Sequence, residues 1–262
     1  MTAQASRFVP DQPPKISCGY LTERVRAAFG PHPFTAQMSE DQVAGLLPEY
    51  LAMSQAFPYL LAGAQRELVF HAMERNQDIA RDIELTSVVA NFICWNATGC
   101  HGGILRGGKA ALPDILLIEN IYSNLLRKDA FQLLRKEIRP NYTARTKQYL
   151  HSLYAGLSSD NSLVRCAYMI AFELHAADMT KSLCASLVNT FKARPDDHEY
   201  FNGHDGGRDP AEKYHGEMTG RLIGELVQLN RGDRFLDGFD RAYRLSFQWC
   251  SGLIGTFLAH ES

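Results

Sequence analysis

Apolar residues recur every three to four positions along almost the whole chain, and this spacing constrains the fold more than any other feature. One clear case runs from Val43 to Met53, where the apolar side chains share one face of a helix. No segment alternates apolar and polar residues as a half-buried strand does, and no hairpin dipeptide joins two apolar segments. The sequence therefore predicts an all-α protein, a single helical bundle of about eight helices.

Capping and helix-breaking residues indicate where the helices begin and end. Ser39 and Gln42 form a capping box, and Pro48 and Pro58 are expected to kink or split the helix that follows. Residues 1–20 are expected to form a flexible, Pro-containing arm, and residues 21–262 a single helical domain. Further helices are expected over about 77–95, 114–138, 143–157 and 162–191, then one opened by Pro210 and a last one over about 236–258.

Composition and charge exclude several classes of protein. The 262 residues are 45% hydrophobic and 21% charged, with a formal net charge of −2, so the chain lacks the basic character of a nucleic-acid binder. No apolar run approaches the roughly 20 residues of a membrane span, and the amino-terminal residues lack the apolar core of a signal peptide. The six cysteines form no CxxC pair, which argues against a structural zinc site. We expect the protein to be cytoplasmic, and a homodimer is one possible assembly.

One carboxylate stands out because it lies inside an apolar helix. Glu173 occurs in the run CAYMIAFELHAADM, where burial of an unpaired carboxylate would cost several kcal/mol. Either Glu173 pairs with an Arg or His of a facing helix, or it belongs to a functional site. His175 points about 200° away from Glu173 on the same helix, so these two side chains cannot share a site by themselves.

A second group combines a loop and a helix. Glu212 and His215 are three residues apart, which places a carboxylate and an imidazole on one helical face, and His204 lies just upstream. The Glu-x-x-His pair is the motif with which di-iron bundle proteins bind metal, although such pairs also form solvated salt bridges. Glu84 and His101 are weaker candidates on the segment that ends in WNATGCH.

The remaining histidines favour structural interpretations. Glu67 and His71 are spaced as a surface pair, His151 and His198 are expected to be exposed, and His32 is expected to pack at a helix start. The chain contains no phosphate-binding loop, no dinucleotide fingerprint and no nucleophile elbow.

Three segments together resemble the haem-oxygenase-like di-iron oxidases and oxygenases, which are fold relatives of the thiaminase and pyrroloquinoline-quinone synthase proteins. The likeness spans roughly residues 28–230. It begins with GPHPFTAQMSEDQVAGLLPEYLAMSQAFPYLLAGA, continues with an inward Glu in AFELHAA, and closes with EYFNGHDGGRDPAEKYH. The separation of 31 residues between Glu173 and His204 (204 − 173) is similar to that family's spacing. In WNATGCH the chain has Asn96 where the family tends to carry a carboxylate.

The resemblance implies a haem-oxygenase-like bundle that binds one or two non-haem irons, and not haem, and that oxidises a small amino-acid-like metabolite with dioxygen. The implied metal ligands are Glu84, His101, Glu173, His204, Glu212 and His215, with Glu173, His204 and His215 at the centre of catalysis. Candidates to hold a substrate carboxylate or amine are Arg165, Tyr168, Lys181 and Tyr214. Two alternatives stay open: a metal-free thiaminase-like or quinone-cofactor-synthase-like enzyme that uses His and Glu as acid and base, and a non-catalytic helical binding protein.

Overall fold

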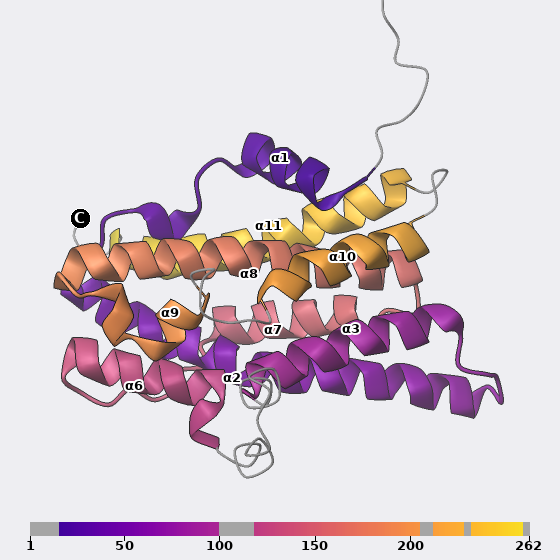
Figure 1. The fold of residues 1–262 in the computed structure, drawn as a ribbon, viewed down its shortest axis with the longest axis horizontal. Coiled ribbons are helices and arrows are strands. Elements are labelled where there is room, and N and C mark those ends of the chain that lie inside the picture. The colour runs from indigo at the N-terminus through magenta and orange to yellow at the C-terminus, as the bar shows by residue number, and fades with distance from the viewer. Residues whose placement is uncertain (1–15, 100–117, 205–211, 228–231, 259–262) are drawn as a thin grey trace, which may run out of the picture.

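The computed structural model describes residues 16–99, 118–204, 212–227 and 232–258, and within these ranges all regular secondary structure is helical. This confirms the predicted all-α class, and Figure 1 shows the helices packed as a bundle. The described α-helices are α1 (Cys18–Phe29), α2 (Glu40–Glu74), α3 (Arg81–Ala97), α6 (Tyr122–Leu134), α7 (Ala144–Leu157), α8 (Ser162–Phe191), α9 (Glu199–His204), α10 (Glu212–Leu226) and α11 (Gly232–Leu258). Short 3-10 helices are η1 (Pro33–Thr35), η2 (Ile118–Asn120) and η3 (Pro195–Asp197).

The helix α8 is the central element of the bundle. Its bounds are those that the sequence predicts, because the Asn161 side chain accepts the N–H groups of Leu163 and Val164 and so caps the first turn. Apolar residues occur on all sides of α8, which is typical of a helix surrounded by others. The helices α3, α7, α9, α10 and α11 all pack against it, and in Figure 1 α8 crosses nearly the whole molecule.

The helix α2 is continuous over 35 residues, so of the two predicted outcomes, a kink or a split at its prolines, the split does not occur. It begins at the predicted capping box, in which Ser39 and Gln42 exchange hydrogen bonds. Each proline removes one N–H group from the helical ladder. The burial of apolar side chains on both sides of the two prolines offsets these lost hydrogen bonds. The exposed fractions of the flanking side chains are 0 to 7%, for Leu47, Tyr50, Phe57 and Leu61.

Two other elements differ from the sequence-based boundaries. The helix α6 ends at Leu134, where Arg135 adopts a left-handed conformation with φ of 53°, and not at the expected Arg139-Pro140. The helix α9 lies between residues 191 and 210, where no helix was expected. The helix α1 begins at Cys18, inside the predicted arm, and residues 1–15 lie outside the described ranges. None of the described helices combines the length and the apolar character that a bilayer crossing requires.

Candidate functional site

A cavity of about 230 Å³ lies inside the bundle, between α2, α3, α6, α8, α9 and α10. Most of its wall is apolar, with Met53 and Phe57 from α2, Ile93 from α3 and Phe172 from α8. Polar atoms reach the cavity in two groups. One group is built on Glu173 and His215, and the other on the tyrosines of α2 and α9. Glu173 is the one carboxylate among the lining residues in the described ranges.

Glu173 and His215 form a close pair at the cavity wall. Glu173 points from α8 toward α10, and its Oε2 atom accepts a hydrogen bond from Nδ1 of His215 at 2.5 Å. The two side chains are only 11% and 16% exposed, so water competes weakly for this bond. The sequence predicts this inward placement of Glu173, and the pairing follows from the packing of α10 on α8.

Asn96 fixes the other side of the His215 ring. The hydroxyl of Tyr122 donates to Oδ1 of Asn96 at 3.1 Å, so the Asn96 amide group is the donor toward Nε2 of His215, at 2.9 Å. Nε2 is then an acceptor, and the proton of the neutral ring lies on Nδ1, facing Glu173. A continuous chain of hydrogen bonds thus runs from Tyr122 through Asn96 and His215 to Glu173.

The second polar group consists of two tyrosine hydroxyls and a threonine. The hydroxyls of Tyr50 and Tyr200 are 3.0 Å apart, and Oγ1 of Thr180 is 3.5 Å from that of Tyr50. Burial raises the pKa of Tyr50 to about 12 and raises the pKa of Tyr200 well above its ordinary value. Both tyrosines are therefore neutral at physiological pH and can donate or accept hydrogen bonds.

Tyr200 is held in place by Asp129, a fully buried residue of α6. The Asp129 carboxylate accepts the backbone N–H groups of Glu199, Tyr200 and Phe201 at 2.9 to 3.3 Å, which caps the first turn of α9. Burial nevertheless raises the pKa of Asp129 from its ordinary value. His198, which directly precedes α9, is only 7% exposed, so the prediction that it lies at the surface is wrong.

The predicted metal ligands fall into three groups in the structure. Glu173 and His215 lie together at the cavity. Glu84 is exposed in the first turn of α3, twelve residues (96 − 84) before Asn96, which is roughly 18 Å along a helix. Glu84 therefore does not join the pair. His101 lies outside the described residues. The backbone of His204 ends α9 and that of Glu212 begins α10, while their side chains lie outside the described part of the chain.

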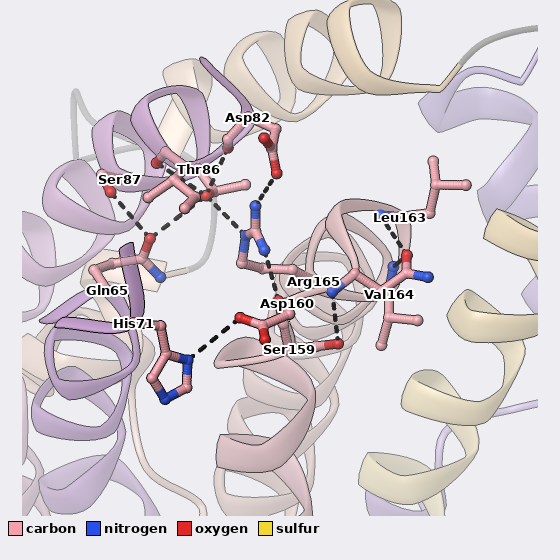
Figure 2. A network of polar contacts seen from close by, with 12 residues as sticks. Gln65, His71, Asp82, Thr86, Ser87, Ser159, Asp160, Leu163, Val164 and Arg165 are labelled. Atoms are coloured by element: carbon pink, nitrogen blue, oxygen red, sulfur yellow. Dashed lines mark hydrogen bonds and ion pairs between the residues drawn. The ribbon is translucent and has the colours of Figure 1, made fainter. Parts of the chain in front are cut away.

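Arg165, predicted as a substrate ligand, is instead fully buried in a structural network (Figure 2). Its Nε donates to Thr86 at 3.1 Å, one terminal nitrogen donates to the Ser159 carbonyl at 2.6 Å, and the other pairs with Asp82. These bonds join α8 to α3 and to the turn before α8. Because all three of its side-chain nitrogens donate to protein acceptors away from the cavity, Arg165 holds these elements together in the core.

The other substrate candidates also lie off the described cavity wall. Tyr168 packs against Gly156 at the contact of α7 with α8, Lys181 is exposed, and Tyr214 is 36% exposed at the start of α10. The predicted surface pair of Glu67 and His71 is confirmed, with 4.0 Å between Nε2 of His71 and a carboxylate oxygen of Glu67. Sequence reasoning missed Tyr50, Tyr122, Tyr200 and Asp129. Only Asp129, a carboxylate within an amphipathic helix, gave a signal that could have been recognised.

Comparison with solved structures places this arrangement in a known fold. The chain is similar to a CADD-like protein of unknown function from Nostoc punctiforme, with a TM-score of 0.64 and 14% sequence identity over 91% of this chain and 96% of that one. A second crystal structure of the same Nostoc punctiforme protein gives a TM-score of 0.62 and 13% identity, over 94% and 96% of the two chains. No protein-family model and no curated protein matches the sequence. The likeness shows the fold, which is the haem-oxygenase-like helical fold.

Proposed function

We propose that this protein is an oxidative enzyme that binds one non-haem iron at Glu173 and His215 and uses dioxygen to oxidise a small, mostly apolar, amino-acid-like molecule. The observation that carries the proposal is the nearly buried carboxylate–imidazole pair on the wall of an apolar cavity, inside a haem-oxygenase-like bundle. Carboxylate and imidazole groups are donors that suit iron and manganese.

The backbone supports further ligands beside this pair. Glu212 precedes His215 by three residues on α10, which places both on one helical face. His204 ends the same short helix that carries Tyr200 to the cavity. A Glu-x-x-His pair on one helix and a carboxylate from a facing helix is how bundle proteins assemble iron sites. Glu173 and His215 are therefore the described side chains that would hold the iron, and His204 and Glu212 stay ligands predicted from the sequence alone.

Asn96 favours one iron over two. Its side chain is 2% exposed and contacts His215, so a neutral amide occupies a position where a second metal would need a carboxylate. Two ferrous ions bring four positive charges into a region that water barely reaches, and such charge has to be compensated nearby. Among the described wall residues only Glu173 offers a negative charge.

Bound iron supplies the redox chemistry with dioxygen, and the protein supplies the surroundings. The volume of about 230 Å³ is below the roughly 300–1,000 Å³ of sites for drug-sized ligands, which indicates a small substrate. The apolar wall excludes water from the reacting atoms. The neutral hydroxyls of Tyr50 and Tyr200 can bind a polar group of the substrate, while Asn96 and Tyr122 hold the His215 ring in one orientation.

A metal-free acid–base enzyme is a second candidate, favoured by the bond between Glu173 and His215. A carboxylate that accepts the Nδ1 proton of a histidine orients the ring and stabilises its charged form. In this arrangement Nε2 of His215 takes a proton from the substrate once Asn96 gives way.

Metal analysis of the folded protein separates the two candidates. After anaerobic reconstitution with Fe(II) and gel filtration, we expect about one iron per chain in the wild type, because Glu173 and His215 supply its anchoring ligands. Glu173→Gln and His215→Gln should each lose the iron. Glu217→Gln is the matched control, since Glu217 is exposed on the same helix and pairs only with Arg221 among its described partners. A wild-type protein that turns over substrate without iron would favour the acid–base enzyme.

A further inference from the structure

Two histidines and a cysteine meet in the core on the opposite side of α8 from the cavity. His32 precedes η1, His175 lies on α8 and Cys250 lies on α11. One donor atom from each residue lies within 4.8 Å of the other two. The three side chains are 3%, 1% and 0% exposed. Three elements far apart in the sequence thus bring two imidazoles and a thiol together in the buried core.

Both imidazoles leave a buried nitrogen without a partner. Nε2 of His32 and Nε2 of His175 have no hydrogen-bond partner among the described residues. Such atoms are uncommon in folded proteins, because each one costs about 1–3 kcal/mol of desolvation that no bond returns. Burial lowers the pKa of His32 to about 4, so its ring is neutral and able to bind a metal.

This cluster is separate from the proposed iron site. His175 follows Glu173 by two residues, which rotates its side chain by about 200° around α8. None of the three residues lines the cavity that contains Glu173 and His215.

We propose that His32, His175 and Cys250 form a site for a single copper ion. Two imidazoles and one thiolate in a three-coordinate arrangement are the donor set of cuprous and blue-copper centres. Among the described residues no further His, Cys, Asp or Glu joins the cluster, so the tetrahedral set of four that structural zinc prefers is not present there.

Charge also favours monovalent copper. Burial raises the pKa of the Cys250 thiol well above its ordinary value, so the thiolate forms only when a cation replaces its proton. One thiolate and Cu(I) sum to zero charge, whereas Zn²⁺ would leave a net positive charge among apolar side chains, at a cost of several kcal/mol.

Binding requires two local adjustments. Metal–nitrogen bonds of about 2.0 Å and metal–sulfur bonds of about 2.3 Å place the donors of a trigonal site roughly 3.5–3.7 Å apart, so the side chains have to close by about 1 Å. Phe34 N–H also donates to Nδ1 of His32 at 3.1 Å, which leaves the ring proton on Nε2. Copper displaces this proton to Nδ1, and Phe34 loses its hydrogen bond. Faster hydrogen exchange at the Phe34 amide is therefore an expected mark of binding.

An anaerobic competition for Cu(I) tests the proposal. The full chain is titrated against a chromophoric Cu(I) chelator in excess, and the wild type should remove about one copper per chain from it. X-ray absorption of this complex should show one sulfur at about 2.2–2.3 Å and two nitrogens at about 2.0 Å. Cys250→Ala should lose the site and keep its helicity, since a free cysteine packs as a small apolar residue.

Two control variants make the result specific. Cys166→Ala also removes a fully buried cysteine, but Cys166 belongs to no such cluster among the described residues, so copper should still bind. Glu173→Gln should keep the copper and lose the iron. The proposal is wrong if the wild type leaves the copper with the chelator, if Cys250→Ala retains one copper per chain, or if the absorption spectrum shows no sulfur neighbour.

Discussion

The amide of Asn96 helps to set the orientation of the His215 ring at the cavity wall. Asn96 accepts the Tyr122 hydroxyl at its amide oxygen and donates from its amide nitrogen to Nε2 of His215. Glu173 accepts the proton of the other ring nitrogen, Nδ1. The ring is therefore held from both sides before any ligand arrives. A metal on Nδ1 of His215 moves the ring proton to Nε2, and Asn96 then holds the ring by turning its amide oxygen toward this proton. Partners that accept the proton of a metal-binding histidine usually matter almost as much as the ligands themselves.

We expect Asn96→Ala to weaken Fe(II) binding by roughly 10- to 100-fold, which is the usual effect of removing an orienting partner of a ligand. The ring of His215 would lose its partner at Nε2 and would be held less firmly in the orientation that it has in the wild type. Anaerobic Fe(II) titration followed by equilibrium dialysis measures this change. Ser87→Ala is the control, since Ser87 lies on the same helix and its hydroxyl donates to Gln65 of α2, away from His215. Unchanged affinity in Asn96→Ala would show that the amide has no part in the site.

Helix boundaries were predictable where the sequence itself carries the capping group. Asn161 and Thr143 accept backbone N–H groups at the starts of α8 and α7, and both helices have the predicted bounds. The helix α9 has only six residues, and its first-turn N–H groups bond to Asp129, about 70 residues earlier in the chain. A helix stabilised by a distant side chain leaves no local signal, which is why the sequence indicated no helix there.

This dependence predicts that Asp129→Asn destabilises the end of the cavity where α9 lies. An amide has one acceptor oxygen in place of two, so some of the three N–H groups lose their partner, at about 1–3 kcal/mol. Hydrogen exchange should accelerate at the amides of Glu199, Tyr200 and Phe201, while α11 stays protected. Equal protection of α9 in the variant and the wild type would contradict this role of Asp129.

At the scale of the whole molecule, the helical periodicity was enough to predict the fold class, but the site depends on how six helices pack. Glu173 could be singled out from sequence because a carboxylate interrupts an apolar helix. Its neighbours Tyr50, Tyr122 and Tyr200 could not, because aromatic residues at helical spacing look like ordinary core. The cluster of His32, His175 and Cys250 was missed for the same reason, since each residue alone is a typical buried side chain.

The buried histidines make the folded molecule sensitive to acid. The unfolded chain binds a proton at His32 below pH 6.5, whereas the folded chain does so only near pH 4, so the free energy of unfolding decreases as the pH falls through this window. The shift corresponds to roughly 3 kcal/mol for His32 by pH 4, and His175 adds in the same direction.

The variant His32→Asn isolates this effect, because an Asn side chain can still accept the N–H of Phe34. Urea unfolding of the metal-free protein at pH 7 and pH 4.5 should show a smaller loss of stability in His32→Asn than in the wild type. His151→Asn, at an exposed position, should behave like the wild type. Identical losses in all three proteins would mean that His32 is not held neutral by the fold.

A crystal structure of the protein soaked anaerobically with Fe(II) tests the central claim most directly, through the anomalous signal of iron. The account predicts one iron peak at the cavity wall, at about 2.0–2.3 Å from a carboxylate oxygen of Glu173 and a ring nitrogen of His215. Two peaks at this site would contradict the single-iron assignment, and an iron-free site in a protein that retains its activity would contradict the iron-dependent function.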